Sequence, residues 1–589
     1  MQLLTVRRAR SRLSDETLPH SRQRYLFFGF CLLFLLILTR LGYWQIVMAQ
    51  ELSMEAENQY QRIQHQSGQR GTILFSDEKP WVLNHQVYRF YTKPNLLTSE
   101  NRSQIIEAVL PVLTKKEQGD EAWLNEKKLQ LISVLDSETK KWAVLGQGLT
   151  EEEKNEIEVK DLPNSGFESY YERFYPEASM GAHLTGFVGK DKDGNDAGYF
   201  GIEGALNNEL APRSFAKKIL TDALGFSLSP QDRTNNLDGR TVVTTIRRDI
   251  QVLLEQKLHQ GMLKYGPQIG EVIVLDPKTG NLLGLATEPT YEQSKYSDFD
   301  TTLFSNPSLT QAYEPGSTFK ILTVAAGIDA GVISPDTICD RCAGPRQFGE
   351  YQIKTWNEEY HPNISMSDAL AKSDNIAMIF VAEKLGPQKL RNYFRDFGIG
   401  EPTDIELQDD TGTPFPNSLR PVELATVSFG QGISTNSMQL VRAVSVIANQ
   451  GILMKPKILS AMYDPITGNN ISVEPKELRR VVSAQTAQQV TQMMIYSAQH
   501  GEAQWTYRPN HTVAGKTGTS QVAVKGGYDE EQTIASFVGF APANNPAFVM
   551  LVKLTAPTSS IWAAETAAPL WYDIAEELYL LLQIPPDRQ

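Results

Sequence analysis

Apolar and polar residues alternate with different periods in successive parts of the chain. An apolar run spans residues 25–38 and continues less cleanly to Ala49, with Arg40 and Gln45 as interruptions. The clean run is shorter than the roughly 20 residues that a membrane-spanning helix needs, whereas the whole stretch is long enough. Residues 51–70 are polar and predict a helix or an extended stalk. The pattern therefore predicts one N-terminal spanning helix.

The next region, residues 71–240, has a mixed pattern. Residues 86–91 alternate as in a strand, residues 103–113 have helical spacing, and turns rich in Pro, Gly and Asn separate these short runs. An acidic segment at 191–196 resembles a calcium loop, but Ile202 stands where such a loop has its bidentate glutamate. We therefore expect an exposed turn there.

A more regular pattern begins near Arg240. Residues 249–263 carry apolar side chains at helical spacing, and two apolar runs, 271–275 and 282–286, flank a tight turn. These runs predict a helix followed by a β-hairpin, with Lys278-Thr-Gly in its turn. Further helices are predicted at residues 319–330, 367–385, 439–451, 484–497 and 563–582, and strands at residues 535–540 and 548–554. Because helices lie between early and late strands, we expect an α+β domain whose sheet pairs the two ends of this region.

Positive charge is concentrated near the N-terminus. The 589 residues allow three or four domains, and their net charge of −13 argues against a nucleic-acid partner. The first 24 residues nevertheless contain six arginines (Arg7, Arg8, Arg10, Arg12, Arg22 and Arg24) against two acidic residues. A basic flank stays in the cytoplasm, so we expect everything after residue 50 to lie outside. A cleaved signal peptide is the alternative, but Met48-Ala49-Gln50 is a poor cleavage site and we favour an uncleaved anchor.

The three cysteines suit an exported protein. Cys31 lies in the apolar run, and Cys339 and Cys342 form a single Cys-x-x-Cys. Zinc would need two more ligands at suitable spacing, and a thioredoxin-like redox pair would need a βαβ setting. We therefore expect a small disulfide in a surface loop. The eight histidines are scattered without metal-binding spacing, so we predict neither a metal nor a cofactor.

The segment Tyr313-Glu-Pro-Gly-Ser-Thr-Phe-Lys320 carries the strongest candidate chemistry. A serine hydroxyl needs a base to become a nucleophile. Lys320 lies one helical turn after Ser317, so the two side chains share a face of the predicted helix. Burial near other cations would lower the pKa of the lysine and let it act as that base. Ser-x-x-Lys also occurs at Ser76, Ser137 and Ser214, where loop-like or acidic sequence favours an ordinary capping or surface role.

Two further motifs follow in order. Ser373-Asp374-Asn375 lies in an apolar helical stretch, where three polar residues would be costly unless they served a cleft. The Ser373 hydroxyl suits proton relay and the Asn375 amide suits a substrate amide; helix capping at a break is the alternative.

Residues 515–520 read as a strand whose small residues let a substrate backbone approach. Lys516, with the hydroxyls of Thr517 and Thr519, would bind a carboxylate. The alternative is a turn like that at residues 278–280.

Taken in this order, the three motifs resemble those of the penicillin-interacting serine acyltransferases. The chain resembles a class B penicillin-binding protein, a monofunctional, membrane-anchored peptidoglycan D,D-transpeptidase. Further segments that carry the resemblance are Arg70-Gly71-Thr72-Ile73, residues 186–189, 198–203, 430–439, 448–451 and 535–542. Residues 74–80 and 210–214 depart from the usual pattern of the domain before the catalytic one, which bears on partner contacts rather than on chemistry.

The resemblance implies a transmembrane helix, a mixed, mostly β pedestal of the dimerisation type, and a transpeptidase domain with a mainly antiparallel sheet flanked by helices. The corresponding predicted boundaries are residues 1–24 for a cytoplasmic tail, 25–49 for the anchor, 50–240 for the pedestal and 241–589 for the transpeptidase domain. The protein would be a single-pass protein of the bacterial cytoplasmic membrane.

The resemblance also implies roles for the motif residues. Ser317 would attack the penultimate D-alanine of a stem peptide with Lys320 as base, and the backbone N–H groups of Ser317 and Thr519 would form the oxyanion hole. Ser373 would help protonate the leaving D-alanine, and Asn375 would orient the donor.

Lys516, Thr517, Gly518 and Thr519 would bind the substrate, and β-lactams would trap Ser317 because their acyl-enzyme hydrolyses slowly. Expected partners are peptidoglycan stem peptides, β-lactams, the membrane and a polytopic glycan polymerase. Arg40 is a plausible contact for that polymerase, and snorkelling to the membrane surface is the alternative.

Three other activities share some of these features. A β-lactamase has the same three motifs, but the sequence Glu203-Gly-Ala-Leu-Asn207, which resembles a deacylation motif, stands before Ser317 rather than after Ser373. A D,D-carboxypeptidase would use water as acceptor. A noncatalytic sensor or scaffold would be favoured by a broken motif, and all three motifs are intact. The sequence leaves open elongation or septation, the acceptor amine and the oligomeric state.

Overall fold

A computed structural model describes residues 20–137, 139–220, 237–524 and 527–587 of the chain. Arg7, Arg8, Arg10 and Arg12 of the predicted cytoplasmic tail lie outside these residues. The chain forms two compact units, which are described separately. One comprises residues 1–67 and 214–235, and the other comprises residues 68–213 and 236–589.

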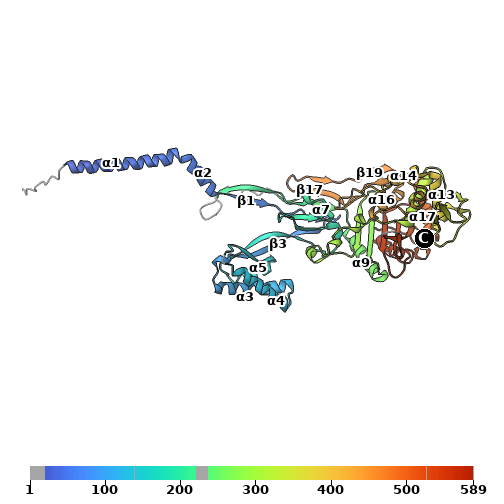
Figure 1. The fold of residues 1–589 in the computed structure, drawn as a ribbon, viewed down its shortest axis with the longest axis horizontal. Coiled ribbons are helices and arrows are strands. Elements are labelled where there is room, and N and C mark those ends of the chain that lie inside the picture. Colours follow the sequence, from blue (N-terminus) through green and yellow to red (C-terminus); the bar gives the residue numbers. More distant parts are fainter. Residues whose placement is uncertain (1–19, 138, 221–236, 525–526, 588–589) are drawn as a thin grey trace, which may run out of the picture. The chain divides into compact units, whose positions relative to one another are not determined.

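The first unit begins with a long apolar helix. Its elements are α1 (His20–Gly42), a π-helical turn η1 (Tyr43–Val47), α2 (Ala49–Tyr60), and β1 (Gln61–Ser67) paired antiparallel with β8 (Ser214–Leu220) (Figure 1). Within the described part of the chain, the segment Arg22–Val47 alone is long and apolar enough to cross a membrane, with a mean hydropathy of 2.1 and none of the window buried. The polar segment predicted as a helix or a stalk contains both a helix and a strand.

The second unit begins with the pedestal. Its strands are β2 (Ile73–Leu74), β3 (Pro80–Thr92), β4 (Ala143–Leu149), β5 (Ser165–Phe174), β6 (Phe187–Lys190) and β7 (Asp196–Tyr199). Its helices are η2 (Pro94–Leu96), α3 (Ser99–Glu117), α4 (Glu121–Leu135), α5 (Glu151–Glu158), α6 (Ala182–Thr185), α7 (Gly201–Ala205) and α8 (Asn207–Leu210). β3 pairs antiparallel with both β4 and β5, and α3, α4 and α5 form a separate small core with these strands.

A buried ion cluster joins distant parts of the pedestal. Arg70 and Arg173 contact opposite oxygens of Glu203 at 2.5 Å and 2.6 Å, and all three side chains are almost fully buried. Glu203 belongs to the Glu-x-x-Leu-Asn sequence that resembles a deacylation motif. Its carboxylate is fully engaged in this cluster, which agrees with the interpretation of that sequence as a coincidence.

The acidic segment at 191–196 forms the turn between β6 and β7. The backbone N–H groups of Asp193 and Asn195 donate to Asp191 Oδ1 at 2.9 Å and 2.8 Å. Most of the segment is exposed. The predicted exposed turn is therefore confirmed.

The remaining elements belong to the region after residue 240. The strands outside the main sheet are β9 (Thr241–Thr244), β12 (Ile338–Cys339), β13 (Arg346–Phe348), β14 (Tyr351–Ile353), β15 (Ile364–Ser365), β16 (Ile452–Met454), β17 (Leu459–Tyr463), β18 (Asn470–Ser472) and β19 (Glu477–Arg480). The helices are α9 (Arg248–Tyr265), η3 (Gln293–Asp298), η4 (Thr301–Leu303), α10 (Pro307–Thr310), η5 (Gly316–Phe319), α11 (Lys320–Asp329), α12 (Met366–Ala371), α13 (Asn375–Leu385), α14 (Pro387–Asp396), α15 (Pro421–Val427), α16 (Ser437–Ala448), α17 (Ala484–His500), η6 (Gln504–Thr506) and α18 (Ala567–Leu581). β17, β18 and β9 continue the pedestal sheet through β2.

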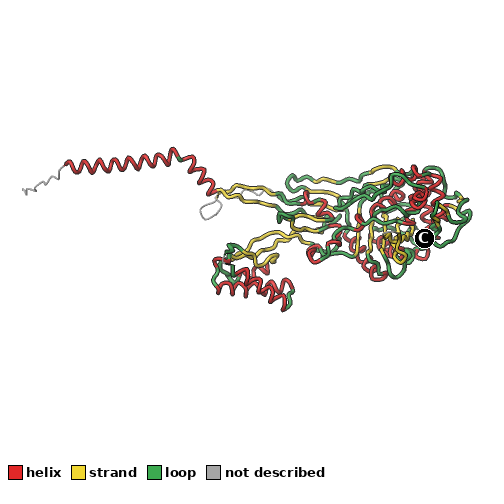
Figure 2. Tube along the Cα trace, in the orientation of Figure 1, coloured by secondary structure: helices red, strands yellow, loops and turns green. Residues whose placement is uncertain are grey.

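A five-stranded antiparallel sheet forms the centre of this region (Figure 2). Its order is β11 (Leu282–Glu288), β10 (Ile269–Leu275), β22 (Phe548–Thr555), β21 (Gly527–Ala541) and β20 (Ala514–Val524). β10 pairs with β11 as the predicted hairpin and with β22 from the far end of the region. The predicted α+β class and the pairing of early with late strands are both confirmed.

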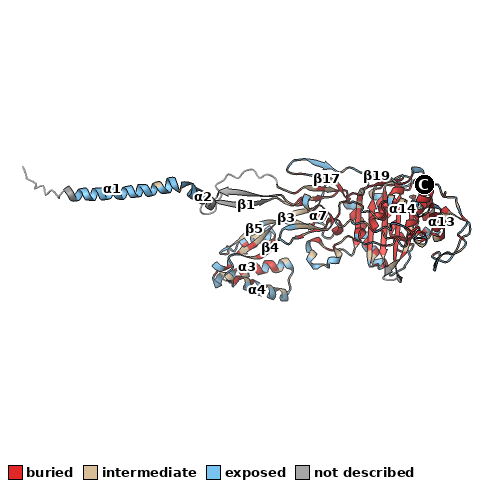
Figure 3. Cartoon of the chain, turned by 45° about the horizontal axis from the view of Figure 1, so that its top comes forward, coloured by how far each residue is buried: buried red, intermediate tan, exposed pale blue. Residues whose placement is uncertain are grey.

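Helices cover both faces of this sheet because its strands are apolar on both sides. Val272 and Val552 pack with α9 and α18 in one buried cluster, whereas Ile273 and Leu551 pack with α11, α13, α16 and α17 in another. Figure 3 shows this buried interior, which contrasts with the exposed α1. The sheet thus provides a rigid support for residues at its β20 edge.

Two predicted helices differ from the observed ones. The stretch predicted as one helix over 367–385 is two helices, α12 and α13, separated at Ser373, whose φ is +57°. Asp374 caps α13 by accepting a hydrogen bond from the N–H of Ala377 at 3.0 Å. The helix predicted from residue 319 is preceded by the 3₁₀ turn η5 and becomes α-helical at Lys320. Both changes occur where a polar motif interrupts the apolar pattern.

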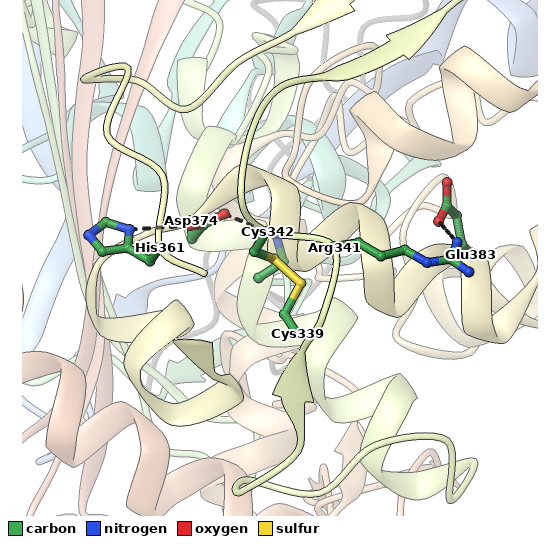
Figure 4. The surroundings of a disulfide bond; sticks show 7 residues. Cys339, Arg341, Cys342, His361, Asp374 and Glu383 are labelled. Carbon is green, nitrogen blue, oxygen red and sulfur yellow. Dashed lines mark hydrogen bonds and ion pairs between the residues drawn. A yellow bond between two sulfur atoms is a disulfide. The ribbon is translucent and has the colours of Figure 1, made fainter. Parts of the chain in front are cut away.

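The two cysteines at 339 and 342 form the expected disulfide (Figure 4). Both are buried, and Arg341 between them forms an ion pair with Glu383 at 3.4 Å. β12, which contains Cys339, pairs with β15. The disulfide therefore lies at the base of the excursion between these two strands.

Candidate active site

A cavity of about 450 Å³ opens beside the β20 edge of the central sheet. Three residues of the predicted site line it, namely Ser317, Asn375 and Thr519. Other lining side chains include Lys354, Trp356, Glu502 and Trp562. The remaining predicted residues, Lys320, Ser373, Lys516, Thr517 and Gly518, are buried next to this cavity.

Ser317 is presented by the turn η5. Gly316 before it has a φ of +56°, a conformation that favours glycine, and its N–H donates to the carbonyl of Gly430 at 3.0 Å. Gly430 in turn has no room for a side chain, because a Cβ atom would lie 2.2 Å from the carbonyl oxygen of Gly316. This close packing leaves Ser317 partly exposed at the cavity while its neighbours are buried.

Lys320 is held by Ser373. Its Nζ donates to the Ser373 carbonyl at 2.5 Å and to Ser373 Oγ at 3.1 Å, and the side chain is completely buried. Burial lowers the pKa of Lys320 to about 7, with the charge of Lys516 acting in the same direction and Glu502 and Asp374 opposing it. A substantial fraction of this amine is therefore neutral near pH 7.

The break between α12 and α13 makes this contact possible. Because Ser373 adopts a left-handed conformation, its carbonyl and its hydroxyl both reach Lys320. Asp374 Oδ2 lies 3.6 Å from His361 Nδ1. Asn375 Nδ2 donates to the Lys354 carbonyl at 3.1 Å, which ties the first residue of α13 to another residue that lines the cavity.

β20 brings the third motif against η5. A Cβ atom on Gly518 would lie 2.8 Å from Thr318 Cγ2 and 2.8 Å from Ser536 Oγ. Only glycine therefore allows the strand to lie this close to the turn that contains Ser317.

The polar residues of β20 differ in their hydrogen bonds. Lys516 is buried, which lowers its pKa, and its Nζ donates to Thr517 O at 3.1 Å and Thr517 Oγ1 at 3.0 Å. Thr517 Oγ1 donates its hydrogen to Glu502 Oε2 at 2.9 Å. Thr519 Oγ1 accepts from the N–H of Ala563 at 3.2 Å, and no described residue accepts its own hydrogen, which is therefore available for a ligand.

Two features of the cavity were not predicted from the sequence. Glu502 follows α17 and belongs to none of the recognised motifs. Trp356 and Trp562 form an edge-to-face pair with ring centroids 5.1 Å apart, and both line the cavity. Only tertiary contacts bring these residues to the site, so no local pattern could have identified them.

None of the described residues of the other Ser-x-x-Lys sequences or of Lys278-Thr-Gly lines this cavity. Ser76 is exposed, and Lys79 forms an ion pair with Asp77 at 2.7 Å. Lys278 lies in the turn between β10 and β11, as predicted, and donates to Asn545 at 2.7 Å. The side chain of Ser214 lies outside the described residues.

The described residues contain no group of three or more His, Cys, Asp or Glu side chains arranged to hold a metal ion. The polar groups of the cavity are instead hydroxyls, amines, amides and a single carboxylate. Such groups suit acyl-transfer chemistry at a serine.

Two known domain families match the chain. The Penicillin binding protein transpeptidase domain matches residues 270–576, and the Penicillin-binding Protein dimerisation domain matches residues 65–244. Stage V sporulation protein D of Bacillus subtilis is 30% identical over 584 residues, which cover 98% of this chain and 88% of that protein. The probable peptidoglycan D,D-transpeptidase PenA of Neisseria gonorrhoeae is 24% identical over 97% of this chain and 94% of its own length.

Solved structures share the fold. Penicillin binding protein 3 from Mycobacterium tuberculosis, complexed with aztreonam, has a TM-score of 0.67 and 24% identity over 89% of this chain and 98% of that chain. Penicillin Binding Protein 2X from Streptococcus thermophilus has a TM-score of 0.70 and 22% identity over 89% of this chain and 81% of that chain.

Proposed function

This chain belongs to the class B penicillin-binding proteins, and on that basis we propose that it is a serine D,D-transpeptidase that cross-links peptidoglycan stem peptides through an acyl-enzyme on Ser317. Relatives named as peptidoglycan D,D-transpeptidases support the reaction class. A related structure in complex with aztreonam supports inhibition by β-lactams.

The state of Lys320 is the observation that carries this proposal. A fully buried amine with a pKa of about 7 is unusual for lysine, and here it lies one turn after a serine that lines a cavity. A surface lysine would be almost entirely protonated at neutral pH and could not accept a proton. Lys320 is therefore suited to act as the base for Ser317.

In the acylation step, Ser317 Oγ loses its proton to Lys320 and attacks the carbonyl carbon of the penultimate D-alanine. The hydrogen bond from Lys320 to Ser373 Oγ provides a path along which a proton can pass to the nitrogen of the leaving D-alanine. The C–N bond then breaks and the ester on Ser317 remains. Asn375, at the cavity wall, is suited to orient the donor peptide.

Negative charge on the carbonyl oxygen needs hydrogen-bond donors. We assign these to the backbone N–H groups of Ser317 and Thr519, which belong to two segments in close contact at Gly518. Lys516, together with Thr517 and Thr519, would bind the terminal carboxylate of the donor. The free hydroxyl hydrogen of Thr519 supports its part in this role.

The N-terminal helix is proposed to anchor the protein in the bacterial cytoplasmic membrane as a single span. The arginine-rich tail would lie inside and the catalytic domain outside. The Arg40 guanidinium lies over the rings of Tyr43 and Trp44, 5.6 Å and 4.8 Å from their centroids. This grouping of a cation and two aromatic rings suits the membrane surface, where a polytopic glycan polymerase would also be contacted.

Covalent labelling tests the proposal. The full-length protein in detergent is incubated with a fluorescent penicillin and the labelled peptide is mapped. We expect a long-lived label on Ser317, its loss in Ser317→Ala, and its retention in Ser76→Ala, which changes the serine of an exposed Ser-x-x-Lys sequence. A label at another residue would refute the site, rapid release of the drug would indicate a β-lactamase, and no label would favour a scaffold.

A further inference from the structure

The cavity contains one acidic side chain that the proposed chemistry does not use. Among the described residues that line it, Glu502 is the only acidic residue and Lys354 is the only basic residue. Gly501, between α17 and Glu502, has no room for a side chain, because a Cβ atom there would lie 2.4 Å from the carbonyl oxygen of Ser497. The position of Glu502 is therefore set by a tightly packed turn.

The two carboxylate oxygens of Glu502 differ. Oε2 accepts the hydrogen bond from Thr517 Oγ1 at 2.9 Å. None of the hydrogen bonds among the described residues uses Oε1, and the side chain is only partly buried. Lys354 does not neutralise it, because its Nζ pairs with Glu358 at 3.0 Å. One oxygen of Glu502 is therefore available to a ligand in the cavity.

A cation and an anion thus lie close together beside the cavity. Thr517 Oγ1 links them, since it accepts from Lys516 Nζ at 3.0 Å and donates to Glu502. Lys516 attracts a carboxylate, and Glu502 attracts an ammonium group. A ligand that complements both groups has a carboxylate and an ammonium group a few bonds apart, which describes the head group of an α-amino acid.

We infer that Glu502 binds the ammonium group of a zwitterionic amino-acid head group and thereby selects the acceptor of the transfer reaction. This inference rests on the proposed function and adds the chemical class of its second substrate. The D-alanine that leaves also has this head group once its amine is protonated. The departing D-alanine therefore leaves the position between Lys516 and Glu502, and the head group of the acceptor then occupies it.

The transfer step replaces the ester on Ser317 by an amide. The bound ammonium loses one proton to water, and the resulting amine attacks the carbonyl carbon of the ester on Ser317. The C–N bond forms, the C–Oγ bond breaks, and a second proton passes from the nitrogen through Lys320 to Ser317 Oγ. The products are an amide and the free serine. Glu502 keeps its charge throughout and holds the acceptor before the attack.

The test measures how one acyl-enzyme divides between an added acceptor and water. The full-length protein in detergent receives a thiolester donor, with either D-alanine or hydroxylamine as acceptor at pH 8. Hydroxylamine is a small nucleophile that is uncharged at this pH, so it serves as the matched control. Mass spectrometry gives the ratio of transfer to hydrolysis, which does not depend on the rate of acylation.

We expect Glu502→Gln to lower this ratio for D-alanine by roughly ten-fold or more, because it removes one partner of a charge pair. The ratio for hydroxylamine should stay the same, and Glu502→Asp should retain most of the transfer to D-alanine. An unchanged D-alanine ratio in Glu502→Gln, or an equal fall for both acceptors, would overturn the inference.

Penicillin labelling of the same preparations distinguishes a failure of the Glu502 role from a failure of the proposed function. A labelled Ser317 with an unchanged D-alanine ratio would remove the role of Glu502 and leave the proposed function intact. The absence of any label in the wild-type protein would instead remove the proposed function itself. If Glu502→Gln does not fold, Glu502→Ala takes its place in the same comparison, because it also removes the carboxylate and should lower transfer to D-alanine alone.

Discussion

Lowering the pH from 8 to 5 should slow the acylation of Ser317 roughly 90-fold. Only the neutral amine of Lys320 can accept the serine proton, and the pKa of this amine is about 7. With that pKa the neutral fraction falls from about nine-tenths at pH 8 to about one-hundredth at pH 5. The expected 90-fold change therefore follows from the pKa of the buried Lys320 amine alone.

The surroundings of Lys320 explain the sign of this effect. Burial disfavours the charged form and is the largest influence on the pKa, and the nearby charge of Lys516 lowers it further. Glu502 and Asp374 raise it, but they do not outweigh the loss of water around the amine. We therefore attribute the expected loss of activity on acidification to protonation of Lys320.

Stopped-flow measurement of the second-order rate constant for a fluorescent penicillin between pH 5 and pH 9.5 provides the assay. The logarithm of the rate constant should rise with unit slope below about pH 7 and reach a plateau above it. Lys320→Arg, which keeps the positive charge, should be slow at every pH. A rate that still rises ten-fold per pH unit at pH 9 would show that the essential base is an ordinary lysine, and the reasoning from burial would be refuted.

Two further predictions concern packing. Glu203→Ala should lower the free energy of unfolding by about 3–5 kcal/mol, because Arg70 and Arg173 would remain buried without their carboxylate; denaturant titration measures this, and a loss under about 1 kcal/mol would contradict it. Gly518→Val should slow penicillin acylation by at least about ten-fold, because its side chain would collide with Thr318 and move β20 away from η5. Gly527→Val is the matched control and should acylate at the wild-type rate, because no described residue other than its chain neighbours has an atom within 4 Å of the added Cβ.

Much of the fold could be predicted from the sequence because the relevant patterns are local. The hairpin of β10 and β11 combines two apolar runs with a turn signal, and α9 has regular helical spacing. The pairing of β10 with β22 followed from the order of strands and helices, since a sheet must bury both of its faces. The hairpin, the helix and the strand pairing could therefore be predicted without knowledge of any single tertiary contact.

The geometry of the site could be predicted only in part. The spacing of Ser317 and Lys320 indicated a shared helical face, but the helix break at Ser373 needs a left-handed residue that local apolar periodicity does not reveal. Asp374, a good N-cap residue, was the available signal for that break. Glu502 and the Trp356–Trp562 pair depend on loops that meet only in the folded protein, so the sequence contained no comparable signal for them.

The two buried lysines explain why the cleft is suited to an anionic donor. Among the described residues, neither Lys320 nor Lys516 forms an ion pair with a carboxylate, and their hydrogen-bond partners are neutral oxygens. Buried charges without a counter-ion are costly, and one route to relief is loss of the proton, as the lowered pKa values of both lysines indicate. A donor carboxylate bound directly to Lys516 would add to the more distant negative charge of Glu502 and stabilise the protonated form of Lys516. Burial and the charge of Lys516 would still lower the pKa of Lys320. Binding of the donor would therefore favour the protonated form of Lys516, which binds the carboxylate, while Lys320 could still act as the base for Ser317.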